Sequence, residues 1–148
     1  MDSKKIIIYN AFITYVLIVI YFFVMKIFGL DEIVELRSLN FLFVIWGVNA
    51  TVKKIILTNK KSAYLTNFGQ GIATSFLAVG MTVISLIVYI GFIDSELLQL
   101  MENSLVWGNQ LSLVEVVFAI AVEGAASSVI CSLIVMQYWK NYKKNIVA

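Results

Sequence analysis

The sequence predicts an all-α, polytopic membrane protein with four transmembrane helices, both chain ends in the cytoplasm, and a short interfacial helix in the outer loop between helices three and four. Hydrophobic residues make up 61% of the 148 residues and charged residues 14%, whereas a soluble domain has roughly 45–50% apolar residues. The apolar residues form unbroken stretches of about twenty, the length that crosses a bilayer. Residues 1–148 are therefore treated as a single membrane domain.

The first two predicted helices span residues 6–28 and 37–57. The first is a continuous apolar stretch of roughly 34 Å, at about 1.5 Å per residue, which is enough for the hydrocarbon core. The second reaches a full crossing only by including Arg37 at one end and Lys53 at the other. Because long basic side chains can reach the membrane surface from inside a helix, this length is acceptable.

The third and fourth predicted helices span residues 68–92 and 113–139, and each is long enough without charged residues at its ends. The outer loop between them, 94–112, begins with Asp94, a good helix N-cap. Four apolar residues follow at helical spacing: Leu97, Leu98, Met101 and Leu105. This pattern predicts a short helix at the outer interface, and the alternative is a solvated loop.

The basic residues indicate the orientation. All but two of the 11 Lys and Arg residues, the exceptions being Lys26 and Arg37, lie near the chain ends or near the loop between the second and third helices. Because basic residues are retained on the cytoplasmic side, both ends and this loop are expected inside the cell. Beyond the N-terminus, the basic residues of this side are Lys53, Lys54, Lys60, Lys61, Lys140, Lys143 and Lys144. Their expected partner is the anionic surface of the lipid bilayer, and no nucleic acid is expected.

The sequence has no histidine and a single cysteine, Cys131. It therefore lacks the usual general base, the commonest metal ligand, and every Ser-His or Cys-His pair. We expect no enzyme activity, no metal site and no cofactor.

Glu123 is the most informative position, because it lies ten residues, or roughly 15 Å, from the outer end of the fourth predicted helix. An ionised carboxylate near the bilayer centre is costly unless it is paired, hydrated or protonated. Counting the same depth along the other helices reaches Asn49 on the second and Thr82 on the third. The hypothesis is a midplane polar cluster of Glu123, Asn49 and Thr82, which either binds a proton or cation or ties the helices together by hydrogen bonds.

Small residues recur at helical spacing on three of the predicted helices. They are Gly47 and Thr51 on the second, Gly71, Thr74, Ser75 and Ala78 on the third, and Gly124, Ser128 and Ser132 on the fourth. Small residues let membrane helices approach closely. The pattern predicts tight packing of these helices, or of two copies of the chain; a ligand groove lined by the same residues is the alternative.

Two short motifs and the end of the fourth helix carry a family resemblance. Residues 67–76 read Asn-Phe-Gly-Gln-Gly-Ile-Ala-Thr-Ser-Phe, residues 92–97 read Phe-Ile-Asp-Ser-Glu-Leu, and the small-residue helix around Ser132 leads into a basic tail at 143–144. Together they resemble a bacterial family of small four-helix membrane proteins known only as a domain of unknown function, the one numbered forty-one ninety-nine. The resemblance implies a four-helix fold in the bacterial inner membrane, and no activity.

Three functions fit these observations. The first is a non-enzymatic accessory or interaction component of the inner membrane that forms a homo-oligomer or joins a larger complex through its small-residue faces. The second is a small proton- or cation-coupled transporter, or a channel-like oligomer, that uses Glu123. The third is an immunity-like or lipid-handling protein that makes contact through the outer amphipathic helix.

Overall fold

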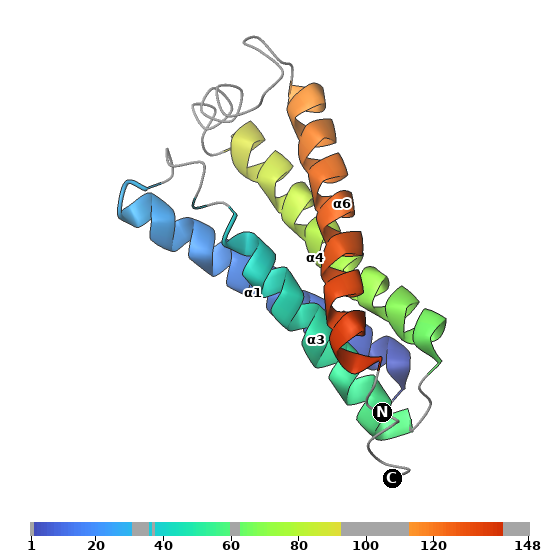
Figure 1. Ribbon diagram of the computed structural model, residues 1–148. Helices are drawn as coiled ribbons and strands as arrows, with labels where there is room; N and C mark the ends of the chain where they lie inside the picture. The colour runs from blue at the N-terminus through green and yellow to red at the C-terminus, as the bar shows by residue number, and fades with distance from the viewer. Residues whose placement is uncertain (1, 31–35, 37, 60–62, 93–112, 141–148) are drawn as a thin grey trace.

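The computed structural model describes residues 2–30, 36, 38–59, 63–92 and 113–140, and in these residues the chain forms four α-helices. They are α1 (Ser3–Ile27), α3 (Asn40–Asn59), α4 (Tyr64–Phe92) and α6 (Leu113–Trp139) (Figure 1). Each is long and apolar enough to cross a membrane, which confirms the prediction of four such helices. The interfacial helix predicted at 94–112 lies outside the described residues, as do Lys60, Lys61, Lys143 and Lys144.

The end of α1 and the turn before α3 explain why the second helix starts later in the chain than the predicted residue 37. Gly29 ends α1 with a φ of 65°, and its N–H donates to the Lys26 carbonyl at 3.1 Å. A glycine in this left-handed conformation is the usual helix stop. Ahead of α3, the N–H of Leu39 donates to the Leu36 carbonyl at 3.1 Å, an i to i+3 bond of a tighter turn. The regular helix therefore begins at Asn40, not at 37.

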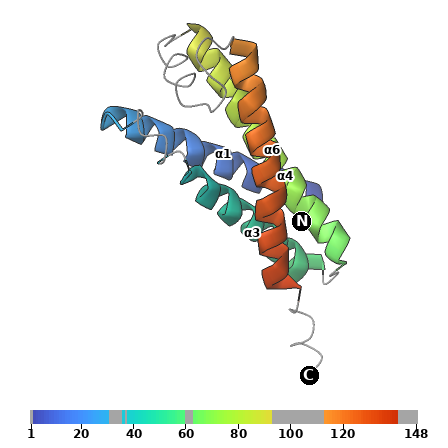
Figure 2. The ribbon, with the colours of Figure 1, turned by 45° about the horizontal axis from the view of Figure 1, so that its top comes forward.

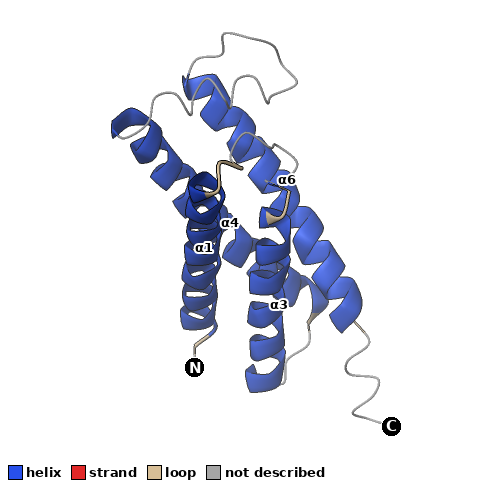
Figure 3. Cartoon of the chain, turned by 90° about the vertical axis from the view of Figure 1, so that its left-hand side faces the viewer, coloured by secondary structure: helices blue, strands red, loops and turns tan. Residues whose placement is uncertain are grey.

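The helices form two pairs, α1 with α3 and α4 with α6. Figures 1 and 2 show that the pairs cross at an angle and diverge toward one end of the bundle. We call this the open end; it holds the end of α1 and the start of α6. The other end, which holds the start of α1 and the end of α6, is called the terminal end. Figure 3 shows the same crossing from the side, with α4 and α6 sloping across α1 and α3.

The apolar core lies where the pairs cross. Residues from α1, α3 and α6 bury their side chains there in one cluster: Ile18, Val44, Val48, Val52, Ile56, Cys131, Val135 and Met136. Both α3 and α4 pack against three other helices, whereas α1 and α6 make little contact with each other.

Glycines mark the closest approaches between helices. A Cβ on Gly47 of α3 would collide with the hydroxyl of Thr14 on α1. A Cβ on Gly71 of α4 would lie 3.1 Å from Val48 Cγ1 and 3.2 Å from Ser132 Oγ, which belong to α3 and α6. A Cβ on Gly124 of α6 would likewise collide with the Val79 side chain of α4. Larger residues at these positions would force the helices apart.

Most of the other predicted small residues also pack against neighbouring helices of the same chain. The hydroxyls of Thr74 and Thr51 lie 3.1 Å apart and join α4 to α3. The buried members of the set are Gly47, Thr51, Gly71, Thr74, Ser75, Ala78, Ser128 and Ser132. These faces join helices of the same molecule, so they are not free to pack against a second copy.

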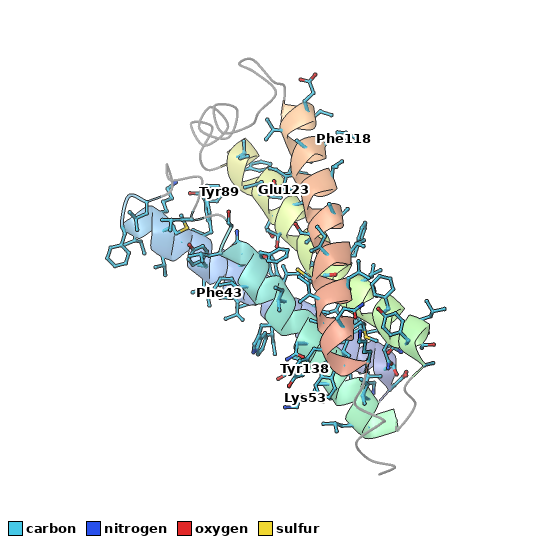
Figure 4. The ribbon with its side chains drawn as sticks, viewed as in Figure 1. Phe43, Lys53, Tyr89, Phe118, Glu123 and Tyr138 are labelled. Carbon is cyan, nitrogen blue, oxygen red and sulfur yellow. The ribbon has the colours of Figure 1, made fainter. Side chains whose placement is uncertain are left out.

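The outside of the bundle is apolar. Large side chains such as Ile84 and Phe118 are 64% and 69% exposed, and Figure 4 shows Phe118 pointing away from the other helices. Contiguous apolar surface of this kind is unfavourable in water and suits a lipid environment. The fold is therefore consistent with a multi-pass membrane protein.

Candidate functional site: a cavity around Glu123

A cavity of about 350 Å³ lies between the two helix pairs. All four helices contribute to it. Its lining residues are Ile18 of α1, Asn40, Phe41 and Val44 of α3 with the preceding Ser38, Val79, Thr82 and Val83 of α4, and Ile120, Glu123, Gly124 and Ser127 of α6. Glu123 is the charged residue among the described residues of this lining, and Figure 4 shows it on the side of α6 opposite to Phe118.

Two of the three residues of the predicted polar cluster, Glu123 and Thr82, share this cavity. The Thr82 hydroxyl donates to the Ala78 carbonyl at 2.9 Å. Its proton is therefore used within α4, but its oxygen can still accept a hydrogen bond or face a cation. Close packing of Gly124 against Val79 holds the two helices at this level.

Asn49, the third predicted residue, lies elsewhere. Its side-chain oxygen accepts a hydrogen bond of 2.8 Å from the indole N–H of Trp139, the last residue of α6. Asn49 is therefore near the terminal end, and it does not line the cavity. The depth count failed because it treated the outer ends of the helices as level, whereas the start of α3 lies deep in the bundle beside Glu123.

Asn40 is the asparagine at the level of Glu123, and the sequence argument missed it. It is the first residue of α3 and lines the cavity. Its side-chain oxygen is buried without a hydrogen-bond partner among the described residues. The sequence signal was available in principle, since asparagine favours helix starts, but the predicted helix began at 37 and placed Asn40 inside it.

Glu123 has no hydrogen-bond or ion-pair partner within the described part of the chain. Its side chain is exposed to the cavity rather than packed among apolar groups. The start of α3 faces the same cavity, and the positive end of its helix dipole partly offsets a negative charge there. The arrangement leaves a carboxylate that can accept a proton, water or a cation from outside the described residues.

The basic residues described at the terminal end are exposed. They are Lys4, Lys5, Lys53, Lys54 and Lys140. The ammonium group of Lys54 lies 5.5 Å from the ring centre of Tyr9, and Lys140 donates to the side chain of Gln137 at 2.8 Å. None of them lines the cavity of Glu123.

Comparisons with models of protein families, with curated proteins and with solved structures find no match for this chain. The family resemblance drawn from residues 67–76 and 92–97 stays a prediction.

Proposed function

We propose that this chain is a small ion-coupled transporter of the bacterial inner membrane, in which Glu123 binds a proton or another cation. The observation that carries the proposal is the Glu123 carboxylate, which has no partner among the described residues and lies on a cavity shared by all four helices. A carboxylate that only tied helices together would have donors beside it, as Asn49 has Trp139.

The accessory function loses its main support. It depended on small-residue faces that contact another copy or a partner, and those residues are buried between helices of the same chain. The cavity offers a different use of the same packing: close contacts near the terminal end hold the helices together while the open end stays apart. Transport requires such a site inside the membrane that is open to ions.

The proposed orientation places the terminal end in the cytoplasm. The exposed lysines of that end favour this arrangement. At the open end, the Lys26 ammonium donates to the hydroxyl of Tyr89. The positive charge of Lys26 is therefore held between α1 and α4. The interfacial helix predicted at 94–112 would then lie on the outer face, and the bacterial inner membrane follows from the family resemblance.

Proton movement in reconstituted vesicles tests the function. Purified protein is placed in liposomes that contain a pH-sensitive dye and a high concentration of one cation, which is sodium, potassium or an organic ammonium ion. The cation is absent outside, so its outward movement through a coupled transporter drives protons inward. We expect proton entry above that of empty liposomes, and at least a tenfold lower protein-dependent rate for Glu123→Gln, because the amide cannot carry a proton. A tenfold loss corresponds to about 1.4 kcal/mol.

Glu115→Gln is the matched control, since Glu115 is a second exposed glutamate of α6 that does not line the cavity. Its rate is expected to equal that of the unchanged protein. Equal rates for Glu123→Gln and the unchanged protein would refute the proposed function. Circular dichroism and gel filtration of each variant confirm that it is folded.

A further inference from the structure

We infer that the ligand of this cavity is a monovalent organic cation with an apolar body, which pairs with Glu123 in place of a proton. This inference rests on the function proposed above and adds the class of substrate. It follows from the size of the cavity, the chemistry of its walls and the one charged side chain, Glu123, among its described lining residues.

The size favours a small molecule over a bare ion. A volume of about 350 Å³ falls in the range of small-molecule sites, which are roughly 300–1,000 Å³. A bare metal ion would fill a small fraction of it and leave the rest to water. A hydrated ion would meet walls that are mostly aliphatic, such as Ile18, Val44, Val83 and Ile120.

The donor set also fits an inorganic cation poorly. Divalent cations in proteins take about six or more oxygen ligands at short range. Among the described residues, the polar side chains of the lining apart from Glu123 are the neutral Ser38, Asn40, Thr82 and Ser127, which come from three different parts of the chain. Among the described residues there is no group of three acidic, histidine or cysteine side chains that could hold a metal ion.

The apolar walls and one aromatic ring suit the body of an organic cation. Phe41 lines the cavity together with Glu123, and ammonium ions, quaternary ones above all, bind over aromatic faces. The unsatisfied oxygen of Asn40 offers a further acceptor to a ligand that carries N–H groups. Such a molecule would bury its apolar part against the valines and isoleucines and place its charge at the carboxylate.

The single carboxylate makes binding of the cation and of the proton mutually exclusive. When the cation enters, the O–H bond of the Glu123 carboxylic acid breaks, the proton leaves to water, and the carboxylate pairs with the incoming charge. One proton is exchanged for one monovalent cation, so the charge in the cavity is unchanged. Among the described residues, the lining holds no other charged or titratable side chain from α1, α3 or α4 that could take over the proton.

Direct binding tests the inference. The full chain is placed in lipid nanodiscs, and binding of radiolabelled benzyltrimethylammonium is measured against empty nanodiscs. We expect saturable binding that weakens as the pH falls and is at least about tenfold tighter than that of tetramethylammonium, because the benzyl group adds buried apolar area. Sodium at the same concentration is expected not to compete.

Variants separate the charge from the walls. Glu123→Gln is expected to lose binding and Glu123→Asp, which keeps the charge, to retain part of it. Val83→Phe, which fills the cavity, is expected to weaken binding by about tenfold or more. Glu115→Gln is expected to bind as the unchanged protein does.

The outcomes distinguish the inference from the proposed function. If benzyltrimethylammonium does not bind, or binds equally to Glu123→Gln, while proton entry still depends on Glu123, the ligand class is wrong and the ion-coupled function stands. If sodium displaces the organic cation at equal concentration, the ligand class is also wrong. If neither binding nor proton entry depends on Glu123, both proposals fail.

Discussion

At the scale of single residues, two polar side chains that the sequence predicts at the same depth in the membrane have different roles. Asn49 is satisfied by the indole N–H of Trp139, whereas Glu123 has no partner among the described residues and faces the cavity. A satisfied amide stabilises a helix contact, and an unsatisfied carboxylate is available to a ligand. The first is expected to affect stability, and the second to affect ion movement.

The bond between Asn49 and Trp139 can be measured by a double-mutant cycle. Asn49→Leu, Trp139→Phe and the double variant are unfolded with SDS in mixed micelles. Because hydrogen bonds between membrane helices contribute modestly, we expect a coupling free energy of about 0.6 kcal/mol. Proton entry is expected to be unchanged in Asn49→Leu. A coupling free energy of zero would show that the bond does not hold α6 to α3.

The sequence predicted Glu123 and Thr82 at the site. Each is a polar residue in a long apolar helix, and its depth follows from the number of residues to the helix end. It did not predict Asn40, because the position of a residue depends on how far its helix reaches toward the membrane surface. That reach is decided by the turns between Leu36 and Leu42, which hydrophobicity does not reveal.

At the scale of helices, glycine contacts set the distance between neighbours. The Thr14 hydroxyl against Gly47 also donates to the Asn10 carbonyl at 2.8 Å. It cannot rotate away without breaking that bond, so α1 and α3 would have to separate to accept a larger residue. Gly80 of α4 has no atom within 4 Å of an added Cβ and offers a matched control.

We predict that Gly47→Ala lowers the free energy of unfolding by about 1–3 kcal/mol, because it overpacks the contact between α1 and α3. Gly80→Ala is expected to be neutral or to stabilise by up to about 1 kcal/mol through helix propensity. Unfolding in SDS is the measurement. Adding Thr14→Ala to Gly47→Ala should recover part of the loss, and an equal effect of the two glycine substitutions would contradict the packing described.

The helices themselves could be predicted from the sequence because long apolar stretches have few alternatives in lipid. The small-residue pattern also identified where they approach, at Gly71 and Gly124 among others. What it could not decide was whether those residues pack within one chain or between two copies. Both arrangements need the same small side chains, and only the tertiary contacts distinguish them.

At the scale of the whole molecule, the divergence of the helix pairs creates the cavity. The pairs are held together in the core around Val48 and Val135 and separate toward the open end. Neither pair alone encloses Glu123. The crossing angle depends on all of the helix contacts together, which is why the cavity could not be predicted from the sequence although its carboxylate could.

The proposed orientation predicts the labelling of two new cysteines. Lys5→Cys and Lys140→Cys are placed at exposed positions of the terminal end, and the native Cys131 is buried and should not react. A membrane-impermeant maleimide is expected to label both only after the cells are opened. Labelling of either one in intact cells would reverse the orientation or separate the two ends.

Infrared difference spectroscopy of the protein in lipid tests most directly whether Glu123 exchanges a proton for a cation. Adding benzyltrimethylammonium should remove the carbonyl stretching band of a carboxylic acid and produce a carboxylate band, and Glu123→Gln should abolish both changes. The exchange would be contradicted if the acid band of the protein without substitutions stayed the same after the cation is added. It would also be contradicted if Glu123→Gln gave the same difference spectrum.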